Sequence, residues 1–381
     1  METIFLDYAA TTPMDPRVQE KMIQCLSDKR AFGNASSPHI FGQRALEWIE
    51  EGRAAIAKLI HTVPRNIIFT SSATEANNLA LKGVSEVYQG QKKHIITAET
   101  EHPSVLEVCR YLEQKGFSLT YLKPEANGII QPEAVEAAIN PETILVSVMQ
   151  VNNETGVVQD IERIGAITRQ KGIYFHVDAV QSLGKLSLDL QKLPVDLMSF
   201  SAHKIYGPKG IGALYVNDTP RVRLSAQLQG GAQERKWRAG TLATHQIAGF
   251  GEACRILTLE MADETKRITA LSQHFSEGIK ALPGVHLNMD RAISLPHFFN
   301  LRFLNIHEQT WEEAFSGLAL SAASACNAMT LQPSFVLRAM GYTEEEARRS
   351  VRFSFGRFTT EEELDKTLFL LKKRLMGESN E

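Results

Sequence analysis

The stretch VDLMSFSAHKIYGPKGI, residues 195–211, places charged and polar side chains directly after an apolar segment. Leu197 to Phe200 is short and mostly apolar, which predicts a buried strand. The tetrapeptide SAHK (201–204) follows, and the glycines and proline of GPKG (207–210) prevent a long regular element. A second short strand is expected at 213–216. The stretch therefore predicts two buried strands joined by a polar, glycine-rich connection.

Lys204 would be costly to desolvate as a cation at the end of a buried strand. Condensation with an aldehyde removes the charge, and such a Schiff base is the resting linkage of pyridoxal phosphate (PLP) enzymes. Ser201 and His203 stand close enough in sequence to hold the phosphate and ring of that cofactor. A surface lysine that snorkels from a strand end is the commoner situation, so Lys204 needs support from the rest of the chain.

Length and composition indicate a soluble globular protein. The 381 residues allow one large domain or two ordinary ones, with 43% hydrophobic and 22% charged residues. A net charge of −3 gives no reason to expect nucleic acid or a membrane surface as partner. No apolar run approaches the ~18 residues of a membrane span, and the acidic N-terminus does not predict a secretory signal. The four cysteines lack C-x-x-C spacing, and so few in a long chain suit a reducing cytoplasm.

Strand-like and helix-like segments alternate through the first half of the chain. Strands are expected at 66–70, 94–99, 119–122, 144–151 and 174–180, and helices at 73–88, 103–115, 132–138 and 161–170. Repeated alternation of this kind predicts a mainly parallel sheet with helices on both faces.

Polar residues follow the predicted strands at their carboxyl ends, which is where open α/β sheets bind ligands. They are Thr74, His102, Asn153, Gln181 and Lys204, with Asp178 late within its strand. The hydroxyl-rich turn at 71–72, before a helix, is also how a phosphate is cradled by free N–H groups, although an ordinary helix cap explains that turn alone. So many polar residues on one edge indicate a ligand site more strongly than any single one.

The second half of the chain predicts a smaller α+β unit. The segment 230–241 (GGAQERKWRAGT) is glycine-rich and polar and is expected to be a loop rather than part of the core. A long helix at 244–281 bridges to the second unit, in which strand pieces are expected at 295–303, 317–320 and 351–358. We therefore predict a large domain at 14–256 and a small domain at 257–381 together with 1–13.

Taken together, these segments resemble the cysteine desulfurases of iron–sulfur cluster assembly, which are class-V aminotransferase-like PLP enzymes of the aspartate-aminotransferase fold (type I). The motifs run from YAATTPMDPRV through GNASSPH, SSATEANNLA, TEHPSV, VNNETGVVQDI, HVDAVQS, SFSAHKIYGPKG, QERKWRAGT and SACNAM to RFSFGRFT. Their order and spacing over nearly the whole chain make the resemblance specific. It implies an α/β PLP-dependent transferase fold, with the cysteine loop in the small domain.

The resemblance implies how a cofactor would be held. Lys204 would form the Schiff base and move protons, and His102 would stack on the ring as an acid–base group. Asp178 would keep the pyridinium nitrogen protonated, and Gln181 would bond the phenolic oxygen. The phosphate ligands would be Thr74, Ser201, His203 and the amide of Ala73, joined by Thr241 from the neighbouring subunit of a homodimer.

The resemblance also implies L-cysteine as the substrate. Asn153, at the edge of the cofactor site, and Arg352 would hold its carboxylate, Arg352 by a bidentate fork. The thiolate of Cys326, with cationic help from His102, would attack the substrate sulfur, so that Cys326 becomes a persulfide and alanine is released. The sulfur would then pass to a cytoplasmic acceptor, either a cluster scaffold or a tRNA-thiolation protein, without direct contact with nucleic acid or a membrane.

Some positions depart from the family pattern. Ala323 stands where the family usually has glycine, and Asn327 stands where serine or threonine usually follows the cysteine. Ala202 replaces the glycine of Ser-Gly-His-Lys, and Ala232 replaces the last of three glycines. We expect these changes to affect loop flexibility and turnover rate rather than the class of reaction.

Cys326 differs from the other cysteines in its surroundings. It lies in a polar loop of small residues, although a free cysteine is more often a small buried hydrophobe. The others lie in helical patterns and are assigned to packing: Cys25, Cys109 and Cys254. His176, within a predicted strand, is interpreted as a core histidine, and Arg357 as an ion-pair partner rather than a substrate contact. His297 and His307 have no partner ligands in the sequence, so no metal site is predicted.

Two other activities remain as alternatives. The first is a related PLP enzyme, either an aminotransferase or a selenocysteine lyase, neither of which requires the Cys326 loop in this form. The second is a sulfur-carrier or assembly protein that binds without catalysis. Release of alanine from cysteine, with a persulfide left on the protein, separates cysteine desulfuration from both.

Overall fold

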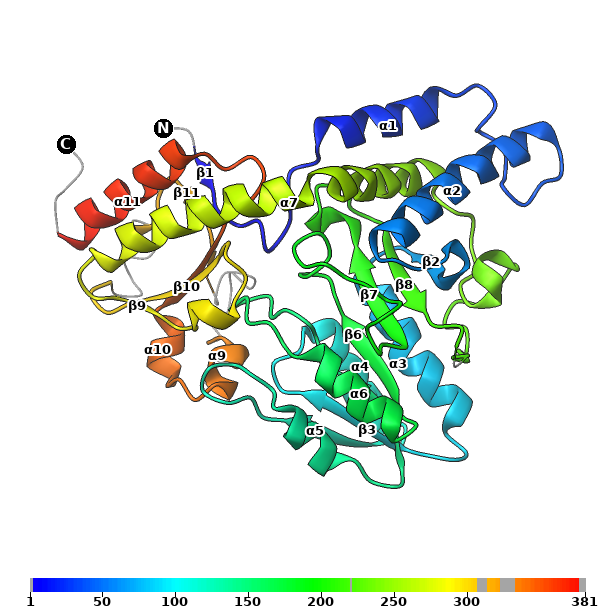
Figure 1. Cartoon of the computed structure of the whole chain (residues 1–381), viewed down its shortest axis with the longest axis horizontal. Helices are drawn as coiled ribbons and strands as arrows, with labels where there is room; N and C mark the ends of the chain where they lie inside the picture. Colours follow the sequence, from blue (N-terminus) through cyan, green and yellow to red (C-terminus); the bar gives the residue numbers. More distant parts are fainter. Residues whose placement is uncertain (1–2, 220, 307–313, 323–332, 377–381) are drawn as a thin grey trace.

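The structure is a computed structural model and describes residues 3–219, 221–306, 314–322 and 333–376. Cys326, Ala323, Asn327 and His307 lie outside the described residues. Figure 1 shows a larger lobe, coloured blue to green, and a smaller lobe, coloured yellow to red, with the long helix α7 (Thr244–Lys280) running along both.

A seven-stranded sheet forms the centre of the larger lobe, in the order β2-β8-β7-β6-β5-β3-β4. The strands are β2 (Ile67–Thr70), β3 (His94–Ala98), β4 (Ser118–Leu122), β5 (Thr143–Ser147), β6 (Tyr174–Asp178), β7 (Leu197–Ser201) and β8 (Gly212–Val216). Strand β8 is antiparallel to β2 and β7, and the other described pairings are parallel. The predicted mainly parallel sheet is confirmed, and the carboxyl ends of its parallel strands share one edge.

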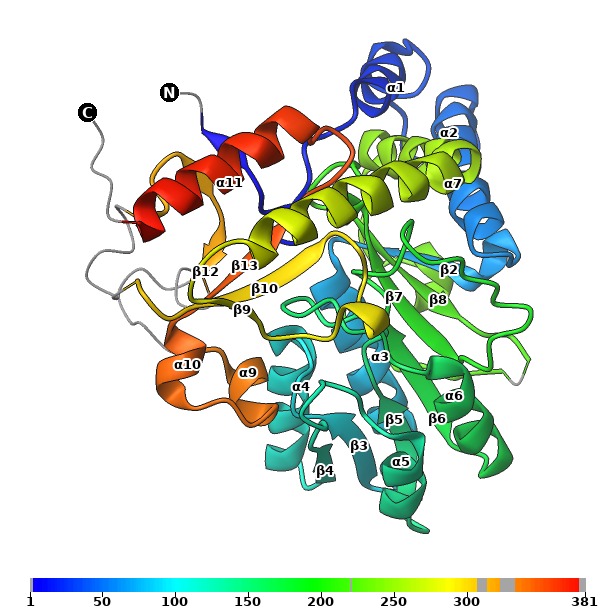
Figure 2. The same ribbon diagram turned by 60° about the vertical axis from the view of Figure 1, so that its left-hand side comes forward.

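Helices cover both faces of this sheet (Figure 2). They include α1 (Pro16–Ser27), α2 (Ile40–Leu59), α3 (Ala73–Tyr88), α4 (Pro103–Gln114), α5 (Pro132–Ala138) and α6 (Ile161–Gln170). Neighbouring strand residues alternate between two cores: Phe69 belongs to the cluster that contains residues of α2 and α7, and Ile68 to the cluster of α3 and α4. Burial on both faces explains why these strands read as continuous apolar runs.

The smaller lobe contains a four-stranded antiparallel sheet in the order β12-β13-β10-β9. Its elements are β9 (Val285–Leu287), β10 (Phe298–Phe303), β12 (Ser321–Ala322), β13 (Ser350–Ser354), α9 (Phe335–Ala339), α10 (Glu344–Arg348) and α11 (Glu361–Leu375). The N-terminal β1 (Ile4–Phe5) pairs in parallel with β11 (Leu318–Ala319), which anchors the start of the chain in this lobe. An aromatic cluster fills the core, with the rings of Phe275 and Phe299 4.9 Å apart.

Helix α7 belongs to both cores. Its residues from Ile247 to Leu257 pack in the larger lobe, whereas those from Ile268 to Ile279 pack with the sheet of the smaller lobe. The domain division at residue 256 stays a prediction, and this change of core close to it supports that division.

The segment 230–241 is a largely exposed loop with a short 3₁₀ turn at Gln233–Lys236, as expected, but it inserts one carboxylate into the larger lobe. The carboxylate of Glu234 is buried and accepts hydrogen bonds from Nη1 and Nη2 of Arg53, each at 2.8 Å. It also accepts one from the amide of Phe69 at 2.7 Å. A buried carboxylate needs such partners, and sequence composition does not reveal them because Arg53 lies far away in the chain.

Several predicted strands are shorter than expected, and two of them bear on the site. Strand β5 ends at Ser147 rather than at 151, although the amides of Val148 and Gln150 still donate to the main-chain oxygens of His176 and Asp178 in β6. Strand β13 ends at Ser354, so Arg357 lies beyond it rather than within it. In both cases the apolar pattern continues past the strand because the residues that follow it, such as Val148 and Phe355, are also buried.

Candidate active site

The edge formed by the carboxyl ends of the parallel strands brings most of the predicted site residues together. Asp178 ends β6, Lys204 follows β7, and His102 caps α4 after β3. The charges of Asp178 and Lys204 both affect the pKa of His102, and the charges of Arg352 and Asp178 both affect the pKa of Lys204. Residues that are far apart in sequence therefore share one electrostatic environment.

Lys204 is held by main-chain oxygens at the end of β7. Its Nζ donates to the oxygens of Ala9 at 2.5 Å and Ala10 at 2.7 Å. Part of the side chain is accessible, yet desolvation of the amine by the surrounding protein lowers its pKa to about 7. A large fraction of the amine is therefore uncharged at neutral pH, which is the form that attacks an aldehyde.

The N-terminal segment crosses over this site from the smaller lobe. Gln181 donates from Nε2 to the oxygen of Ala9 at 2.8 Å, so Ala9 O receives hydrogen bonds from two of the predicted site residues. Thr12 donates from Oγ1 to the oxygen of His203 at 2.9 Å and accepts from the amide of Tyr206 at 2.8 Å. Sequence reasoning gave no role to this segment, although YAATTP was among the motifs that carry the resemblance.

Asp178 is fixed by two donors. Its Oδ2 accepts from Nδ2 of Asn77 at 2.9 Å and its Oδ1 from the amide of Val180 at 3.0 Å. Asn77 also donates to Oγ of Ser104, again at 2.9 Å. Sequence analysis missed Asn77, and the available signal was an amide side chain on the buried face of α3.

His102 is held in a defined tautomer. Its Nδ1 accepts a hydrogen bond from the amide of Ser104 at 3.1 Å and lies 2.8 Å from the Ser104 hydroxyl. The neutral ring therefore carries its proton on Nε2. The protein that surrounds the ring lowers its pKa, and the charge of Lys204 adds to this effect while Asp178 opposes it. A neutral imidazole suits a group that accepts and returns a proton, but it does not supply the positive charge that was expected to help the Cys326 thiolate.

The turn between β2 and α3 offers an anion site. Ser72 caps α3, and Ala73 and Thr74 are its first two residues, whose N–H groups have no partner inside a helix. A Cβ atom on Gly212 would lie 2.6 Å from the carbonyl carbon of Ser72, so close packing of this turn against β8 requires a glycine. Ser201 is paired with Gly212 in the sheet, which places it beside the turn.

His203 completes this side of the site. Its Nδ1 lies 3.1 Å from Oγ1 of Thr11. Burial lowers the pKa of His203 to about 4, and the nearby lysines Lys204, Lys209 and Lys185 act in the same direction. The ring is therefore neutral at neutral pH, so it would meet an anion through an N–H group rather than through a charge.

Arg352 and Asn153 form a second polar group, contributed by both lobes. Nη1 of Arg352 donates to the main-chain oxygen of Asn153, and Nη2 donates to Oδ1 of Asp7, each at 2.7 Å. Nε of Arg352 and Oδ1 of Asn153 are buried without a hydrogen-bond partner among the residues that the structure describes. Buried polar atoms without partners are costly, which indicates a place for a polar ligand.

One predicted site residue of the described chain is not joined to this group. Thr241 is exposed, and Cys326 lies outside the described residues. The other three cysteines are buried, as expected, and burial raises the pKa of Cys25 to about 11 and of Cys109 to about 12. Neither thiol is a reactive thiolate near neutral pH.

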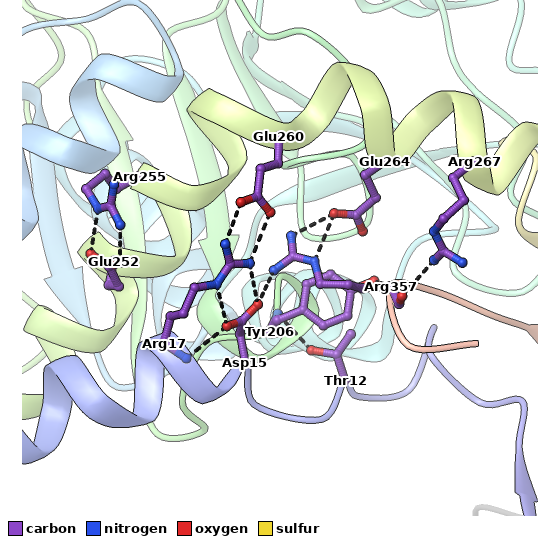
Figure 3. A network of polar contacts seen from close by, with 10 residues as sticks. All are labelled: Thr12, Asp15, Arg17, Tyr206, Glu252, Arg255, Glu260, Glu264, Arg267 and Arg357. Carbon is purple, nitrogen blue, oxygen red and sulfur yellow. Dashed lines mark hydrogen bonds and ion pairs between the residues drawn. The ribbon is translucent and has the colours of Figure 1, made fainter. Parts of the chain in front are cut away.

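Two residues assigned to structural roles are confirmed there. His176 is buried in the sheet, with Nδ1 2.9 Å from Oγ of Ser147 and Nε2 3.0 Å from Oγ of Ser199. Arg357 forms ion pairs with Asp15 and Glu264 (Figure 3). His297 is buried, and burial lowers its pKa to about 3.

Comparison with known proteins identifies the family. The family model described as "Aminotransferase class-V" matches residues 4–367. The curated "Cysteine desulfurase IscS" of Proteus mirabilis (strain HI4320) is 56% identical over 363 residues, 95% of this chain and 90% of the relative. The chain belongs to the cysteine desulfurases of the class-V aminotransferase family. The relative of the same name from Azotobacter vinelandii (strain DJ / ATCC BAA-1303) is 53% identical over 363 residues, again 95% of this chain and 90% of the relative.

Solved structures agree with the assignment to the cysteine desulfurases. A "NIFS-LIKE PROTEIN" superposes with a TM-score of 0.91 at 36% identity. The match covers 98% of this chain and 100% of the chain of that protein. The structure titled "SspA in complex with cysteine" gives a TM-score of 0.85 at 39% identity, over 94% of this chain and 100% of the other. The expected PLP-transferase fold is confirmed.

Cysteine desulfurases of this family depend on PLP, and the residues present fit that cofactor. A lysine with a pKa near 7 is available for an aldehyde, and Asp178 is a fixed carboxylate for a protonated ring nitrogen. The glycine-dependent turn at the start of α3 is suited to a phosphate.

Proposed function

We propose that the protein takes sulfur from L-cysteine, releases L-alanine and carries the sulfur as a persulfide on Cys326. One observation carries this proposal: the buried Nε of Arg352 and Oδ1 of Asn153 lack partners in the described chain, beside a lysine with a pKa of about 7. An α-amino acid offers a carboxylate to the arginine and an amine toward the cofactor site. The relative solved in complex with cysteine supports cysteine as that amino acid.

PLP, when bound, supplies an electron sink that weakens the bond between Cβ and sulfur of the substrate. Lys204 would hold the cofactor, with Asp178 at the ring nitrogen, Gln181 at the phenolic oxygen and His102 against the ring. The phosphate would lie on Ser201, His203, Thr74 and the amide of Ala73, with Thr241 reaching the cofactor of the neighbouring subunit.

The chain's own residues would then act in sequence. Arg352 and Asn153 orient the substrate by its carboxylate, and uncharged Lys204 accepts the proton from Cα. The Cys326 thiolate attacks the substrate sulfur: a sulfur–sulfur bond forms as the bond to Cβ breaks, and the electron pair stays with the carbon. Protonation of that carbon and return of the proton from Lys204 to Cα would give alanine, so one cysteine yields one alanine and one persulfide.

We also propose a homodimer that passes sulfur to an acceptor protein in the cytoplasm. The name of the curated relatives favours an iron–sulfur cluster scaffold as the acceptor, with a tRNA-thiolation protein as the second candidate. In the described part of the chain, no helix combines the length and apolar character needed to cross a membrane.

The test of this function is a Cys326→Ala variant. It should bind PLP and change its absorbance spectrum with cysteine, because Lys204, Asp178 and Arg352 are intact, but it should form no persulfide and release no alanine catalytically. Cys25→Ala, which removes a buried thiol in α1, is the matched control and should keep both products. Alanine release from Cys326→Ala at the unmutated rate would show that Cys326 is not the nucleophile. Ala323→Gly is expected to raise turnover without changing substrate affinity.

A further inference from the structure

The guanidinium group of Arg352 is already paired with a carboxylate of the chain itself. Nη2 donates to Oδ1 of Asp7 at 2.7 Å, and the side chains of Arg352 and Asp7 are 9% and 19% exposed. Nη1 is bonded to the main chain of Asn153, so Nε is the one guanidinium nitrogen without a partner in the described chain, although each Nη carries a second hydrogen. A ligand carboxylate that binds side-on to Nε and Nη2 by two parallel hydrogen bonds would therefore share Nη2 with Asp7 and lie against its negative charge.

The main chain of Asp7 is fixed, whereas its side chain is not. Asp7 forms a parallel β-bridge to Ser354. The main-chain oxygen of Asp7 accepts hydrogen bonds from the amides of Ala10 and Thr11 at 3.0 and 3.4 Å. Its carboxylate makes one hydrogen bond within the described chain, the one to Arg352. Rotation of a single side chain about its own bonds is enough to release the arginine.

Asp15 shows the contrast with a purely structural carboxylate. In the network of Figure 3, Asp15 accepts hydrogen bonds from the amide, Nε and Nη2 of Arg17 and from Nη1 of Arg357. Both of its oxygens are occupied by several donors, and a ligand would have to break all of these bonds together. Asp7, by contrast, is held by one charged donor, Arg352, whose Nε has no hydrogen-bond partner in the described chain.

We propose that Asp7 is an internal competitor for the substrate carboxylate, paired with Arg352 in the empty site and displaced when an amino acid binds. The inference rests on the proposed function, in which Arg352 binds that carboxylate. The pairing keeps a buried guanidinium neutralised while no substrate is present. It also weakens the binding of every carboxylate by the same factor, so that appreciable occupancy needs a ligand with further contacts, such as an amine directed at the cofactor site.

The experiment measures binding of L-alanine to the holoenzyme by isothermal titration calorimetry. Asp7→Asn removes the competing charge but keeps the size of the side chain, and it should lower the Kd by roughly tenfold, the factor that corresponds to about 1.4 kcal/mol. Asp7→Glu keeps a competing carboxylate, so this variant should bind L-alanine more weakly than Asp7→Asn does. Asp218→Asn breaks another aspartate–arginine pair of 2.7 Å, that with Arg65, and should leave the Kd unchanged.

An unchanged or higher Kd in Asp7→Asn would overturn the inference. Arg352→Lys separates this failure from a failure of the proposed function. If Arg352→Lys weakens binding while Asp7→Asn does not tighten it, Arg352 binds the carboxylate and Asp7 is not its competitor. If Arg352→Lys leaves the Kd unchanged, the carboxylate site itself is wrong and the inference falls with it.

A measurement on the unmutated protein keeps the inference testable if Asp7→Asn does not fold. A crystal structure of the holoenzyme with L-alanine should show the ligand carboxylate on Arg352 and the side chain of Asp7 turned away from Nη2. Asp7 still bonded to Nη2, with the ligand in place, would contradict displacement.

Discussion

Lys185 donates a hydrogen bond from its Nζ to the main-chain oxygen of Lys204 over 2.5 Å. Burial lowers the pKa of Lys185 to about 8, with Glu264 opposing and Arg357 adding to the shift. A second lysine thus lies beside the backbone that carries the candidate catalytic amine, and its charge is among those that lower the pKa of Lys204. The hydrogen bond holds the turn after β7, and the charge affects the amine itself.

We expect Lys185→Met to raise the pKa of Lys204 from about 7 toward its ordinary 10.5. Burial and Arg352 would still lower it, and Asp7 and Asp178 would still raise it, but one nearby cation would be gone. Competitive acetylation of the cofactor-free protein across pH, followed by mass spectrometry of the Lys204 peptide, measures this pKa. Lys185→Arg keeps the charge and is the control. An unchanged or lower pKa in Lys185→Met would exclude this electrostatic role.

Lys204→Ala is expected to give a folded protein that does not retain PLP covalently, because the amine at the end of β7 is lost. Borohydride reduction of the unmutated holoenzyme, followed by peptide mapping, should label Lys204. Lys209, an exposed lysine in the loop that follows, is the internal control. Label on Lys209 instead would refute the assignment.

Asn77→Leu should weaken PLP binding, since Asp178 would lose the donor to its Oδ2. A hydrogen bond to a charged group contributes about 1.5–3 kcal/mol, so the Kd for PLP should rise by roughly ten- to a hundredfold. Dialysis equilibrium with the cofactor-free protein measures this Kd. Asn66→Leu, which removes another buried amide, should lower stability without changing PLP affinity. Equal effects of the two variants on PLP affinity would argue against a specific role of Asn77.

Arg357→Leu should destabilise the fold by roughly 1.5–3 kcal/mol, since Glu264 loses this charged donor and Asp15 keeps only Arg17. The side chains of Asp15 and Arg357 are 2% and 11% exposed, so water does not replace the lost pair. Urea unfolding gives the free energy. Arg110→Leu breaks an exposed pair with Glu107 and should cost less than about 1 kcal/mol. Similar losses in the two variants would contradict the role assigned to the network in Figure 3.

The contribution of this network should disappear in acid. Burial by itself raises the pKa of Asp15, but hydrogen bonds from Arg17 and Arg357 outweigh it and lower the pKa from 3.8 to about 2. Because the pKa is lower in the folded state, the stabilisation is fully present above pH 3.8 and is lost as the pH falls toward 2. The stability difference between the unmutated protein and Arg357→Leu should therefore shrink in that range. A constant difference down to pH 2 would contradict the pairing.

The active enzyme is expected to sediment at about twice the chain's 42.4 kDa. In the single chain Phe32 and Ile40, before and at the start of α2, are 78% and 55% exposed, and the Phe32 ring lies 4.9 Å from that of Phe41. Exposed aromatic groups of this kind favour association, so Phe32→Asp should shift the protein toward the monomer. Leu259→Asp, also at an exposed apolar residue, is the control. A monomeric mass for the active, unmutated enzyme would exclude the dimer.

The sequence by itself determined the main sheet, the place of Lys204 just after a buried strand, and the family. Alternation of strands and helices is a local property, because side chains that are buried on both faces of a sheet leave an apolar run in the sequence. Asp178 and Lys204 were found in the same way, since each lies at the end of such a run. The packing of Cys25, Cys109 and Cys254 followed from their helical patterns.

The tertiary structure alone decided which distant residues touch. Asp7 and Arg352 are separated by 345 positions, and Glu234 and Arg53 by 181, so no local pattern reveals either pair. Nothing in composition shows that the oxygens of Ala9 and Ala10 hold the amine of Lys204. These contacts depend on where the first residues of the chain pass between the two lobes. That path is set by the pairing of β1 with β11 and by packing against β13, both of which form only when the chain is folded.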